Sequence, residues 1–486
     1  MQEKADIIIS KIDECNLRVD GEEGILRELN EYYTFEVPGF QFMPGFQSGL
    51  WDGRIRQYSL WKRQLPGGLL PKTLAWCKKN QYSVTIDKCL LPTFIPDKEF
   101  DELYDSLNLP STFTKEDYQT KLIKRGLELK RALLLGPTGM GKSLIIYALC
   151  NIAIRDTGKK ALIVVPTKNL VSQFPVEFRN YGYQKPMCKF SESKDANQKA
   201  EVYISTWHSV YKLPKTFFDQ FGILIFDEVQ YATAKSITTL MGKTNNIEYK
   251  FGLTATLQDA KCHALTLEGM FGPKISSTTT RKLMDAGKLT PIKIIAVLLK
   301  HPDEICKRMK EASYHEEIEA IIESTKRNAF LIKFISKIEN NTLVLFRRIK
   351  HGKLLHDHLK LISEGRPIYY IDGSVSGEER EYIRQQMEVE QNAILVASFD
   401  TMSTGVNIKN LHNAVFVHPS KAKIKVLQSI GRILRKLNGK NEARLFDIAD
   451  NMMWKKHKNT TFDHFLFRLE AYQKESHPVI YKEINL

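Results

Sequence analysis

Short, largely apolar runs alternate with polar tails and helix-length segments through the middle of the chain. The first five runs are Ala132–Leu135, Ala161–Val165, Glu201–Ile204, Phe221–Phe226 and Lys250–Leu253. Continuous rather than alternating apolar runs are typical of strands that are buried on both faces of a parallel sheet. The pattern predicts a doubly wound α/β domain in which the polar tails gather at the carboxyl ends of the strands, the edge where such sheets bind ligands.

The same pattern resumes after a break at Gly272-Pro273. We expect a helix around Arg281–Ala286, a new strand from Ile292 and a long charged helical region over residues 303–338. Further strands are predicted at Thr342–Phe346, Ile368–Ile371, Ala393–Ala397 and Ala414–Val417. The sequence therefore predicts two consecutive parallel-sheet domains, over residues 114–275 and 276–450. A tail over residues 451–486 should form one or two helices that pack on the second sheet.

Residues 1–95 differ from the rest of the chain and predict a small α/β domain. Three of the five tryptophans fall between positions 51 and 76, and seven Lys or Arg residues stand against one acid between positions 37 and 80. The aromatic residues could form the core of this domain, or a basic and aromatic face could bind nucleic acid through phosphates and base stacking. The better nucleic-acid candidates are Arg54, Arg56, Lys62 and Arg63. Residues 96–113 are acidic and predict a linker with a short helix.

Composition narrows the class of partner. The formal net charge of +15 favours a polyanion, of which nucleic acid is the first candidate. Seven cysteines without a C-x-x-C pair argue against a disulfide framework or a zinc site, and favour a reducing cytoplasm. The N-terminus lacks the pattern of a signal peptide, and no apolar run is long enough to cross a membrane.

The segment Gly136–Ser143 reads G-P-T-G-M-G-K-S and lies between a predicted strand and a predicted helix. This is the context of a phosphate-binding loop, in which glycines let backbone N–H groups face phosphate oxygens. The loop residues are Gly136, Pro137, Thr138, Gly139, Met140, Gly141, Lys142 and Ser143. Lys142 can reach the β- and γ-phosphates of a nucleotide, and the Ser143 hydroxyl can hold Mg²⁺.

Two further sets of residues fit the same chemistry. Asp227 and Glu228 follow the fourth apolar run, where the first can hold Mg²⁺ and the second can deprotonate an attacking water. A helix starting at Thr114, capped by that residue, would carry Gln119, whose amide matches the edge of adenine. On a helix, Gln428, Arg432 and Arg435 would share one face, and such a guanidinium pair can stabilise charge in phosphoryl transfer.

Taken together, the motifs resemble those of superfamily 2 helicases. GPTGMGKS, PTKNL, STWHS, DEVQ, LTATL, SVSGEER, STGVNI and QSIGRILR occur in the order and spacing of that superfamily, over roughly residues 114–450. The chain is most similar to a bacteriophage branch in which a short basic domain containing W-D-G-R-I-R, here Trp51 to Arg56, precedes the motor. The resemblance implies two RecA-like domains with ATP between them and nucleic acid across both.

The resemblance also implies roles for individual residues. Gln119, the loop and Gly405 would bind ATP, and Ser143 and Asp227 would bind Mg²⁺. Glu228 would act as base, and Gln428, Arg432 and Arg435 would reach the γ-phosphate. Gln230, Thr254 and Thr256 would couple hydrolysis to movement; Gln230 replaces a common histidine, yet can still hydrogen-bond to the third motif. Nucleic acid would contact Thr167, Lys168, Thr206, Ser374 and Ser398.

The leading hypothesis is an ATP-dependent helicase or translocase that remodels branched DNA, including forks, Holliday junctions, D-loops and R-loops, in recombination, replication and repair. We expect a monomer in the cytoplasm, of the host if the source is a phage, that works with single-stranded-DNA-binding or recombination proteins. Three alternatives stay open: an RNA helicase, a restriction-type translocase, and an annealing protein in which ATP only switches binding. No nuclease constellation supports the restriction alternative, and the motor motifs do not distinguish DNA from RNA.

Overall fold

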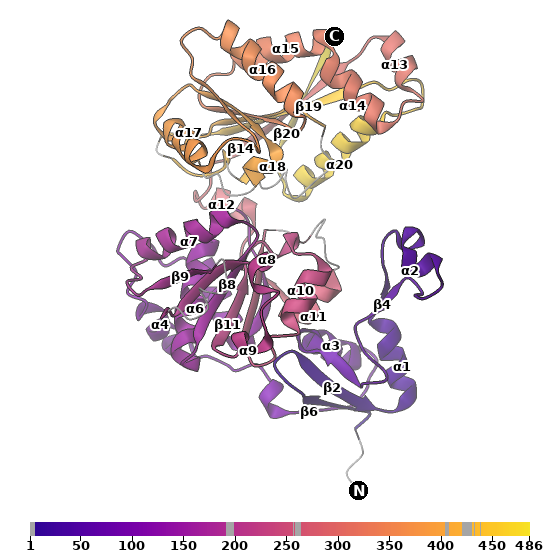
Figure 1. Ribbon diagram of the computed structural model, residues 1–486, viewed down its shortest axis with the longest axis vertical. Coiled ribbons are helices and arrows are strands. Elements are labelled where there is room, and N and C mark those ends of the chain that lie inside the picture. Colours follow the sequence, from indigo (N-terminus) through magenta and orange to yellow (C-terminus); the bar gives the residue numbers. More distant parts are fainter. Residues whose placement is uncertain are drawn as a thin grey trace. The chain divides into compact units, whose positions relative to one another are not determined.

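The computed structural model describes residues 5–190, 199–255, 257, 264–403, 408–419, 430–431, 433–437 and 439–486. The chain divides into two compact units, and the division of the main chain falls between Ser277 and Thr278. Each unit contains one large parallel sheet covered by helices on both faces (Figure 1). The predicted fold class, two tandem RecA-like domains preceded by a small α/β domain, is confirmed. Within the described residues, no helix has the length and apolar character needed to cross a membrane.

The small N-terminal domain is built on a four-stranded sheet in the order β5-β2-β1-β6. Its elements are β1 (Ile7–Lys11), β2 (Asn16–Gly21), α1 (Glu23–Tyr32), β5 (Gln64–Pro66), α3 (Leu70–Lys79) and β6 (Val84–Ile86). Alternate residues of β1 and β2, such as Ile7, Ile9 and Val19, point into the core with Tyr58 and Trp76. Part of the aromatic content is therefore core, as one of the two readings of the sequence expects.

A small lobe stands clear of this sheet (Figure 1). It consists of β3 (Thr34–Glu36), a 3-10 turn at Phe40–Phe42, α2 (Pro44–Gln47) and β4 (Arg54–Arg56), and β3 pairs with β4 in an antiparallel ribbon. A turn at Asp52-Gly53 leads into β4. Gly53 has φ +78°, and a Cβ atom there would collide with the Phe40 ring. Neither the 3-10 turn nor α2 contains a buried residue, so the lobe is largely exposed.

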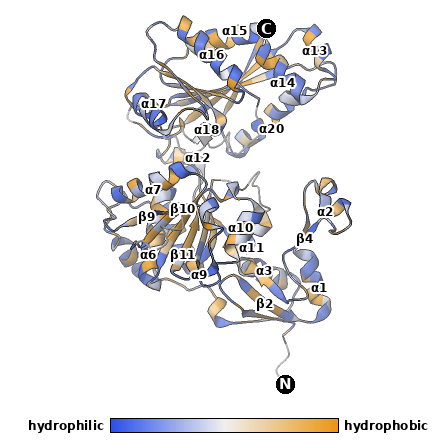
Figure 2. Ribbon diagram, in the orientation of Figure 1, coloured by the Kyte–Doolittle hydropathy of each residue, from blue (hydrophilic) through white to orange (hydrophobic). Residues whose placement is uncertain are grey.

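The first large sheet has the order β13-β7-β12-β11-β8-β10-β9, with every strand pairing described as parallel. Its strands are β7 (Arg131–Leu135), β8 (Lys160–Val165), β9 (Met187–Phe190), β10 (Val202–Thr206), β11 (Phe221–Phe226), β12 (Tyr249–Thr254) and β13 (Lys274–Ser276). The helices are α5 (Asp117–Leu129), α6 (Lys142–Thr157), α7 (Lys168–Asn180), α8 (Trp207–Val210), α9 (Lys215–Phe218), α10 (Ala234–Met241) and α11 (Ala264–Phe271), preceded by α4 (Asp97–Asp105) in the linker. Figure 2 shows the apolar character of the central strands. The edge strands β9 and β13 were not predicted.

The expected start of the helix that carries Gln119 is wrong. Helix α5 begins at Asp117, and Thr114 does not cap it. The Thr114 hydroxyl instead hydrogen-bonds to Glu116 Oε1 at 2.7 Å, so its side chain is engaged with a neighbouring side chain rather than with the first turn.

The N-terminal domain meets the amino ends of β7 and β12, at the edge of the sheet opposite to the predicted site. Two cations from those strands, the half-buried Arg131 and the buried Lys250, donate to the carbonyl oxygen of Glu14. Burial lowers the pKa of Lys250 to about 7. Lys72 of the small domain pairs with Glu268 of α11 at 3.1 Å. These contacts leave the carboxyl ends of the strands available for chemistry.

The second unit has a sheet in the order β16-β17-β15-β18-β19-β14-β20. Its strands are β14 (Ile292–Lys300), β15 (Thr342–Phe346), β16 (Ile368–Ile371), β17 (Ile394–Ser398), β18 (Asn413–Phe416), β19 (Ala443–Asn451) and β20 (Val479–Asn485). The helices are α12 (Thr280–Asp285), α13 (Asp303–Met309), α14 (Tyr314–Glu323), α15 (Thr325–Ser336), α16 (Ile349–Ile362), α17 (Gly377–Val389), α18 (Phe399–Ser403) and α20 (Thr460–Lys474). The charged region expected as one long helical stretch is three helices, and Ser313 begins the second of them with a capping box.

The tail is helical only in part. Helix α20 packs on the sheet through Arg468, which pairs with Asp447 of β19 at 2.7 Å, both side chains being buried. The chain then forms β20, which adds to the sheet edge beside β14 in parallel. The expectation of helices alone is therefore wrong. A partly exposed edge strand lacks the continuous apolar run that marks the central strands.

Candidate active site

The loop between β7 and α6 has the geometry that its sequence predicts. Gly136 donates its N–H to the carbonyl of Thr254 at 3.0 Å, which ties the loop to the end of β12. Gly141 has φ +82° and is the residue before α6, where the left-handed backbone favours glycine. A Cβ atom at Gly141 would collide with the side-chain nitrogen of Gln119. The structure thus places the buried Gln119 amide directly against the phosphate loop.

Lys142, Glu228 and Gln230 form a connected group beside this loop. Lys142 Nζ donates to Glu228 Oε1 at 2.7 Å, and Gln230 Nε2 donates to Glu228 Oε2 at 2.6 Å. Both oxygens of the Glu228 carboxylate are therefore held in place. The Lys142 and Glu228 side chains are each less than one-fifth exposed, so this ion pair is shielded from most solvent screening.

The backbone of Glu228 is in an unfavourable conformation. Its φ of 51° and ψ of 48° lie in the left-handed region, which costs a residue with a side chain on the order of 1 kcal/mol or more. Strand β11 ends at Phe226, and the reversal at Glu228 begins the 3-10 turn Val229–Tyr231. Strain of this kind persists where the surrounding contacts fix the side chain, as Lys142 and Gln230 do here.

Asp227 is a buried carboxylate next to that reversal. It is 7% exposed, and its Oδ1 atom has no hydrogen-bond partner among the described residues. Burial and the neighbouring Glu228 charge raise the pKa of Asp227 to about 7, while Lys142 opposes the rise. A buried carboxylate oxygen without a donor suits a bound cation. The residues present therefore fit Mg²⁺, with Asp227 and the hydroxyl of Ser143 as the predicted ligands.

The Asp227 charge should destabilise the protein when no metal is bound. The pKa of Asp227 in the folded state exceeds its usual value of 3.8, so the folded state binds a proton more tightly than the unfolded state does. The free energy of unfolding therefore falls as pH rises from about 4 to about 7. Asp227→Asn should therefore raise that free energy by about 1–3 kcal/mol at pH 8 in EDTA and change little at pH 4. Scanning calorimetry of both proteins at the two pH values measures this; equal stability at pH 8 would contradict the buried-charge account.

Ser143 lies in the first turn of α6. Its hydroxyl is 2.8 Å from the hydroxyl of Tyr181, the residue that directly follows α7. The sequence did not point to Tyr181, because it lies 38 positions from Ser143, just after a different helix.

The coupling residues are placed in part. Thr254 is fully buried at the end of β12, and Thr256 lies outside the described residues. Gln230 was expected to hydrogen-bond to the third motif, but the contact that the structure describes is with Glu228. The other amide atom, Gln230 Oε1, is buried without a partner in the described part of the chain.

Of the three residues predicted to reach the γ-phosphate, the structure describes Arg435. Gln428 and Arg432 lie outside the described residues, and so does Gly405, a predicted nucleotide contact. Arg435 forms an isolated antiparallel bridge with Leu289. The expectation that Arg435 sits on a helical face is therefore wrong. Lys440 Nζ donates to the carbonyl oxygen of Arg435 at 3.1 Å, a contact that was not expected from a helix at this position.

The motor residues predicted to contact nucleic acid lie at the carboxyl ends of strands. Thr167 and Lys168 follow β8 at the start of α7, and Thr206 ends β10. In the second unit, Ser398 ends β17 and Ser374 follows β16. The Ser374 hydroxyl donates to Asp372 Oδ1 at 2.5 Å, and that of Ser398 is 2.7 Å from the Thr401 hydroxyl.

The arginines predicted to bind nucleic acid in the N-terminal domain are all in ion pairs. The pairs join Arg54 to Glu36, Arg56 to Asp52 and Arg63 to Glu23. Lys62 is exposed. The first two pairs lie on the lobe, where both partners are about half exposed, and exposed ion pairs add little to stability. A phosphate could therefore replace either acid at little cost.

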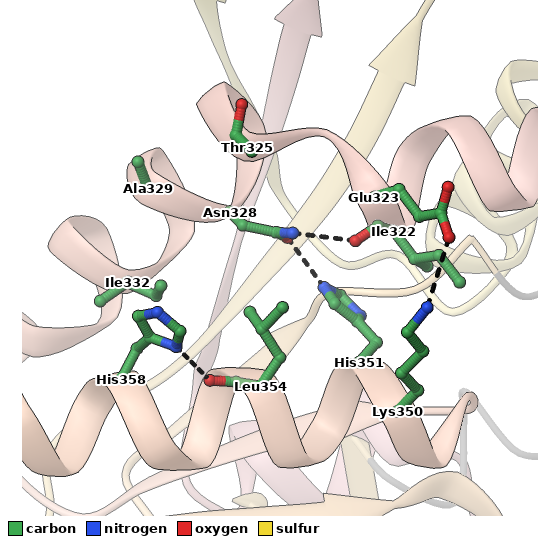
Figure 3. A pocket seen from close by; sticks show the side chains of 10 residues that line it. All are labelled: Ile322, Glu323, Thr325, Asn328, Ala329, Ile332, Lys350, His351, Leu354 and His358. Carbon is green, nitrogen blue, oxygen red and sulfur yellow. Dashed lines mark hydrogen bonds and ion pairs between the residues drawn. The ribbon is translucent and has the colours of Figure 1, made fainter.

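A cavity of about 390 Å³ lies between α15 and α16 in the second unit (Figure 3). Apolar side chains such as Leu354 and Ile332 line it, and Lys350 and Glu323 pair near it at 3.4 Å. His351 Nε2 is 3.0 Å from Asn328 Oδ1, and burial lowers the pKa of His351 to about 3, so the ring is neutral. None of the predicted site residues lines this cavity.

Comparison with known proteins identifies the family. The family described as DNA helicase UvsW, N-terminal, matches residues 6–87; Type III restriction enzyme, res subunit, matches residues 112–259; and Helicase conserved C-terminal domain matches residues 326–436. The ATP-dependent DNA helicase uvsW of Enterobacteria phage T4 is 35% identical over 99% of this chain and 100% of its own length. The DNA 3'-5' translocase XPB2 of Sulfurisphaera tokodaii is 25% identical over 72% of this chain and 85% of its own.

Solved structures agree with this result. The crystal structure of T4 UvsW superposes with a TM-score of 0.52 at 33% identity, covering 99% of each chain. The predicted resemblance is confirmed along the whole chain, including the small N-terminal domain that precedes the motor. The protein belongs to the UvsW family of superfamily 2 helicases and is an ATP-dependent DNA helicase.

Proposed function

We propose that this helicase unwinds and branch-migrates branched DNA, including forks, Holliday junctions, D-loops and R-loops, in recombination, replication and repair. The exposed apolar lobe of the N-terminal domain, which lies next to basic residues, is the observation that favours branched DNA as the substrate. The motor supplies the energy through ATP hydrolysis at the site beside the phosphate loop.

The contacts around Glu228 suggest how hydrolysis starts. In the described structure Lys142 neutralises one Glu228 oxygen. A bound triphosphate would compete for the Lys142 ammonium, since the loop directs phosphates toward it. Glu228 Oε1 would then be available to accept a proton from the attacking water, while Gln230 keeps the other oxygen in place.

Four residues would hold the nucleotide and its metal. Gln119 lies against the loop, where its amide can recognise adenine, and Lys142 would bind the β- and γ-phosphates. Ser143 and Asp227 would hold Mg²⁺, which when bound supplies positive charge to the phosphate oxygens. Because Asp227 must be ionised to bind a cation, metal binding should strengthen as pH rises through about 7.

The lobe presents apolar side chains to solvent. Phe42 is 84% exposed and Leu50 is 88% exposed. Phe40 and Phe46 pack edge to face at 4.7 Å between ring centres, so they form a small internal contact that leaves Phe42 and Leu50 outside it. Apolar side chains that proteins insert between base pairs are of this kind. We infer that the lobe packs against the unpaired or unstacked bases at a DNA branch point.

The charge around the lobe favours DNA as its occupant. Residues 37–80 contain seven Lys or Arg residues and one acid. Arg54 and Arg56 in β4 are the cations closest in sequence to the Asp52-Gly53 turn, and their exposed ion pairs can exchange for phosphate contacts. A partner that offers both phosphates and accessible base faces matches this surface.

Removing the two exposed side chains tests the role of the lobe. Phe42→Ala combined with Leu50→Ala should weaken binding to forked and four-way DNA about tenfold, since a stacked base contributes about 1–3 kcal/mol. Binding to linear duplex should change less than twofold. Fluorescence anisotropy with the three DNAs at one salt concentration measures the affinities.

Leu361→Ala is a matched control, because Leu361 is also largely exposed but lies in α16 of the second unit. This control should keep the preference for branched DNA. Equal weakening on branched and linear DNA by the lobe variant, or none on either, would contradict the proposed role of the lobe.

A further inference from the structure

The hydroxyl of Ser143 has a defined partner within the first unit. Its oxygen lies 2.8 Å from the hydroxyl oxygen of Tyr181, a good distance for a hydrogen bond between two hydroxyl groups. Ser143 belongs to the phosphate loop motif, whereas Tyr181 is the residue that directly follows α7 and caps its end. The contact therefore joins the predicted metal ligand to a helix other than the one that carries it.

The Tyr181 ring is firmly placed. The residue is 8% exposed, and its ring contacts Phe113 edge to face at 5.0 Å and Tyr147 at 5.4 Å between ring centres. A phenol keeps its proton at neutral pH, because its ordinary pKa is about 10. A rigid, neutral hydroxyl can hold the Ser143 side chain in one orientation without adding charge to the site.

The chemistry of a metal-bound serine requires such a partner. When a hydroxyl oxygen binds a divalent cation, its proton is repelled and becomes a stronger hydrogen-bond donor. The proton must then point away from the metal toward an acceptor, and such outer partners orient metal ligands and raise their basicity. Tyr181 supplies an acceptor oxygen at hydrogen-bond distance from Ser143.

We propose that Tyr181 is a positioning residue for the magnesium site: its hydroxyl accepts the Ser143 proton and orients the Ser143 oxygen toward the cation. This inference rests on the proposed role of Ser143 as a metal ligand. In this proposal Tyr181 acts through Ser143 and is not itself a ligand of the metal.

A magnesium titration of nucleotide binding tests the inference without using hydrolysis. The full chain is titrated with a fluorescent ATP analogue in EDTA and at increasing MgCl₂ concentrations. Tyr181→Phe should need roughly tenfold more Mg²⁺ for half-maximal enhancement of binding, as is typical when an outer partner of a metal ligand is removed. Its affinity in EDTA and its melting temperature should equal those of the unmodified protein.

Tyr183→Phe is the matched control. Tyr183 is also buried close to the end of α7 and contacts Tyr147 and Phe178, but its hydroxyl has no hydrogen-bond partner in the described part of the chain. Removing that hydroxyl should leave the magnesium requirement unchanged.

Ser143→Ala separates failure of this inference from failure of the proposed site. It should abolish the gain in nucleotide binding that Mg²⁺ produces, and adding Tyr181→Phe to it should change nothing further. If Ser143→Ala leaves the magnesium requirement unaltered, the proposed metal site is wrong. If Ser143→Ala acts as expected but Tyr181→Phe has no effect, or lowers the magnesium requirement, only the role of Tyr181 is overturned.

Discussion

Lys142→Ala should reduce DNA-stimulated ATP hydrolysis by about a thousandfold, the scale of losing a preorganised charge at a phosphoryl-transfer site. The lysine has two roles in this account: it neutralises Glu228 at 2.7 Å before the nucleotide binds, and it binds the phosphates afterwards. Its removal leaves Asp227 and Glu228 adjacent without their cation, which should raise the pKa of Asp227 further and weaken metal binding. A phosphate-release assay with saturating branched DNA measures the loss.

Lys98→Ala controls for the change in charge in the Lys142 experiment. Lys98 is an exposed residue of α4, within the same unit of the chain, and it takes no part in the phosphate loop. This variant should hydrolyse ATP at the rate of the unmodified protein. Hydrolysis by Lys142→Ala at that same rate would contradict the assignment of the loop as the ATP site.

Glu228→Gln should block hydrolysis by about a thousandfold or more while nucleotide binding changes only a few-fold. The amide keeps the size of the side chain and one acceptor oxygen, so it can still accept a hydrogen bond from Lys142 or Gln230, although not from both. It cannot accept a proton from water. Equilibrium binding of a fluorescent ATP analogue and single-turnover hydrolysis on the same preparation separate the two effects.

The control for this variant is Glu248→Gln, which makes the same change at the amino end of β12. Glu248 pairs with Lys130 there, at the edge of the sheet away from the phosphate loop. The control should retain both binding and hydrolysis. Continued strand remodelling by Glu228→Gln would favour the alternative in which ATP only switches nucleic-acid binding.

The sequence predicted the central strands well because they are buried on both faces. Phe221–Phe226 was expected as a strand with those bounds and is β11 with the same bounds. Edge strands were missed, since β9 and β20 mix exposed and buried positions and lack a continuous apolar run. The start of α5 was also misplaced, because Thr114 has a side-chain partner that local spacing alone does not reveal.

The candidate site was predictable in its residue types and not in its contacts. The phosphate loop and the Asp227-Glu228 pair are visible as motifs because their neighbours along the chain are part of the pattern. The left-handed backbone of Glu228 depends on contacts that the fold supplies, and the Ser143–Tyr181 hydrogen bond joins the first turn of α6 to the residue after α7. Arg435 was expected on a helix because it is spaced from Gln428 and Arg432 as residues on one helical face are. Its bridge to Leu289 instead depends on a segment nearly 150 positions earlier in the chain.

The central claim is that ATP hydrolysis at the Glu228 site drives the remodelling of branched DNA. The most direct measurement follows labelled strands released from forked, four-way, D-loop and R-loop substrates by the unmodified protein and by Glu228→Gln, with ATP and Mg²⁺ present. The account predicts product on the branched substrates with the unmodified protein alone, and none with Glu228→Gln despite its bound ATP. Equal product from the two proteins would contradict it.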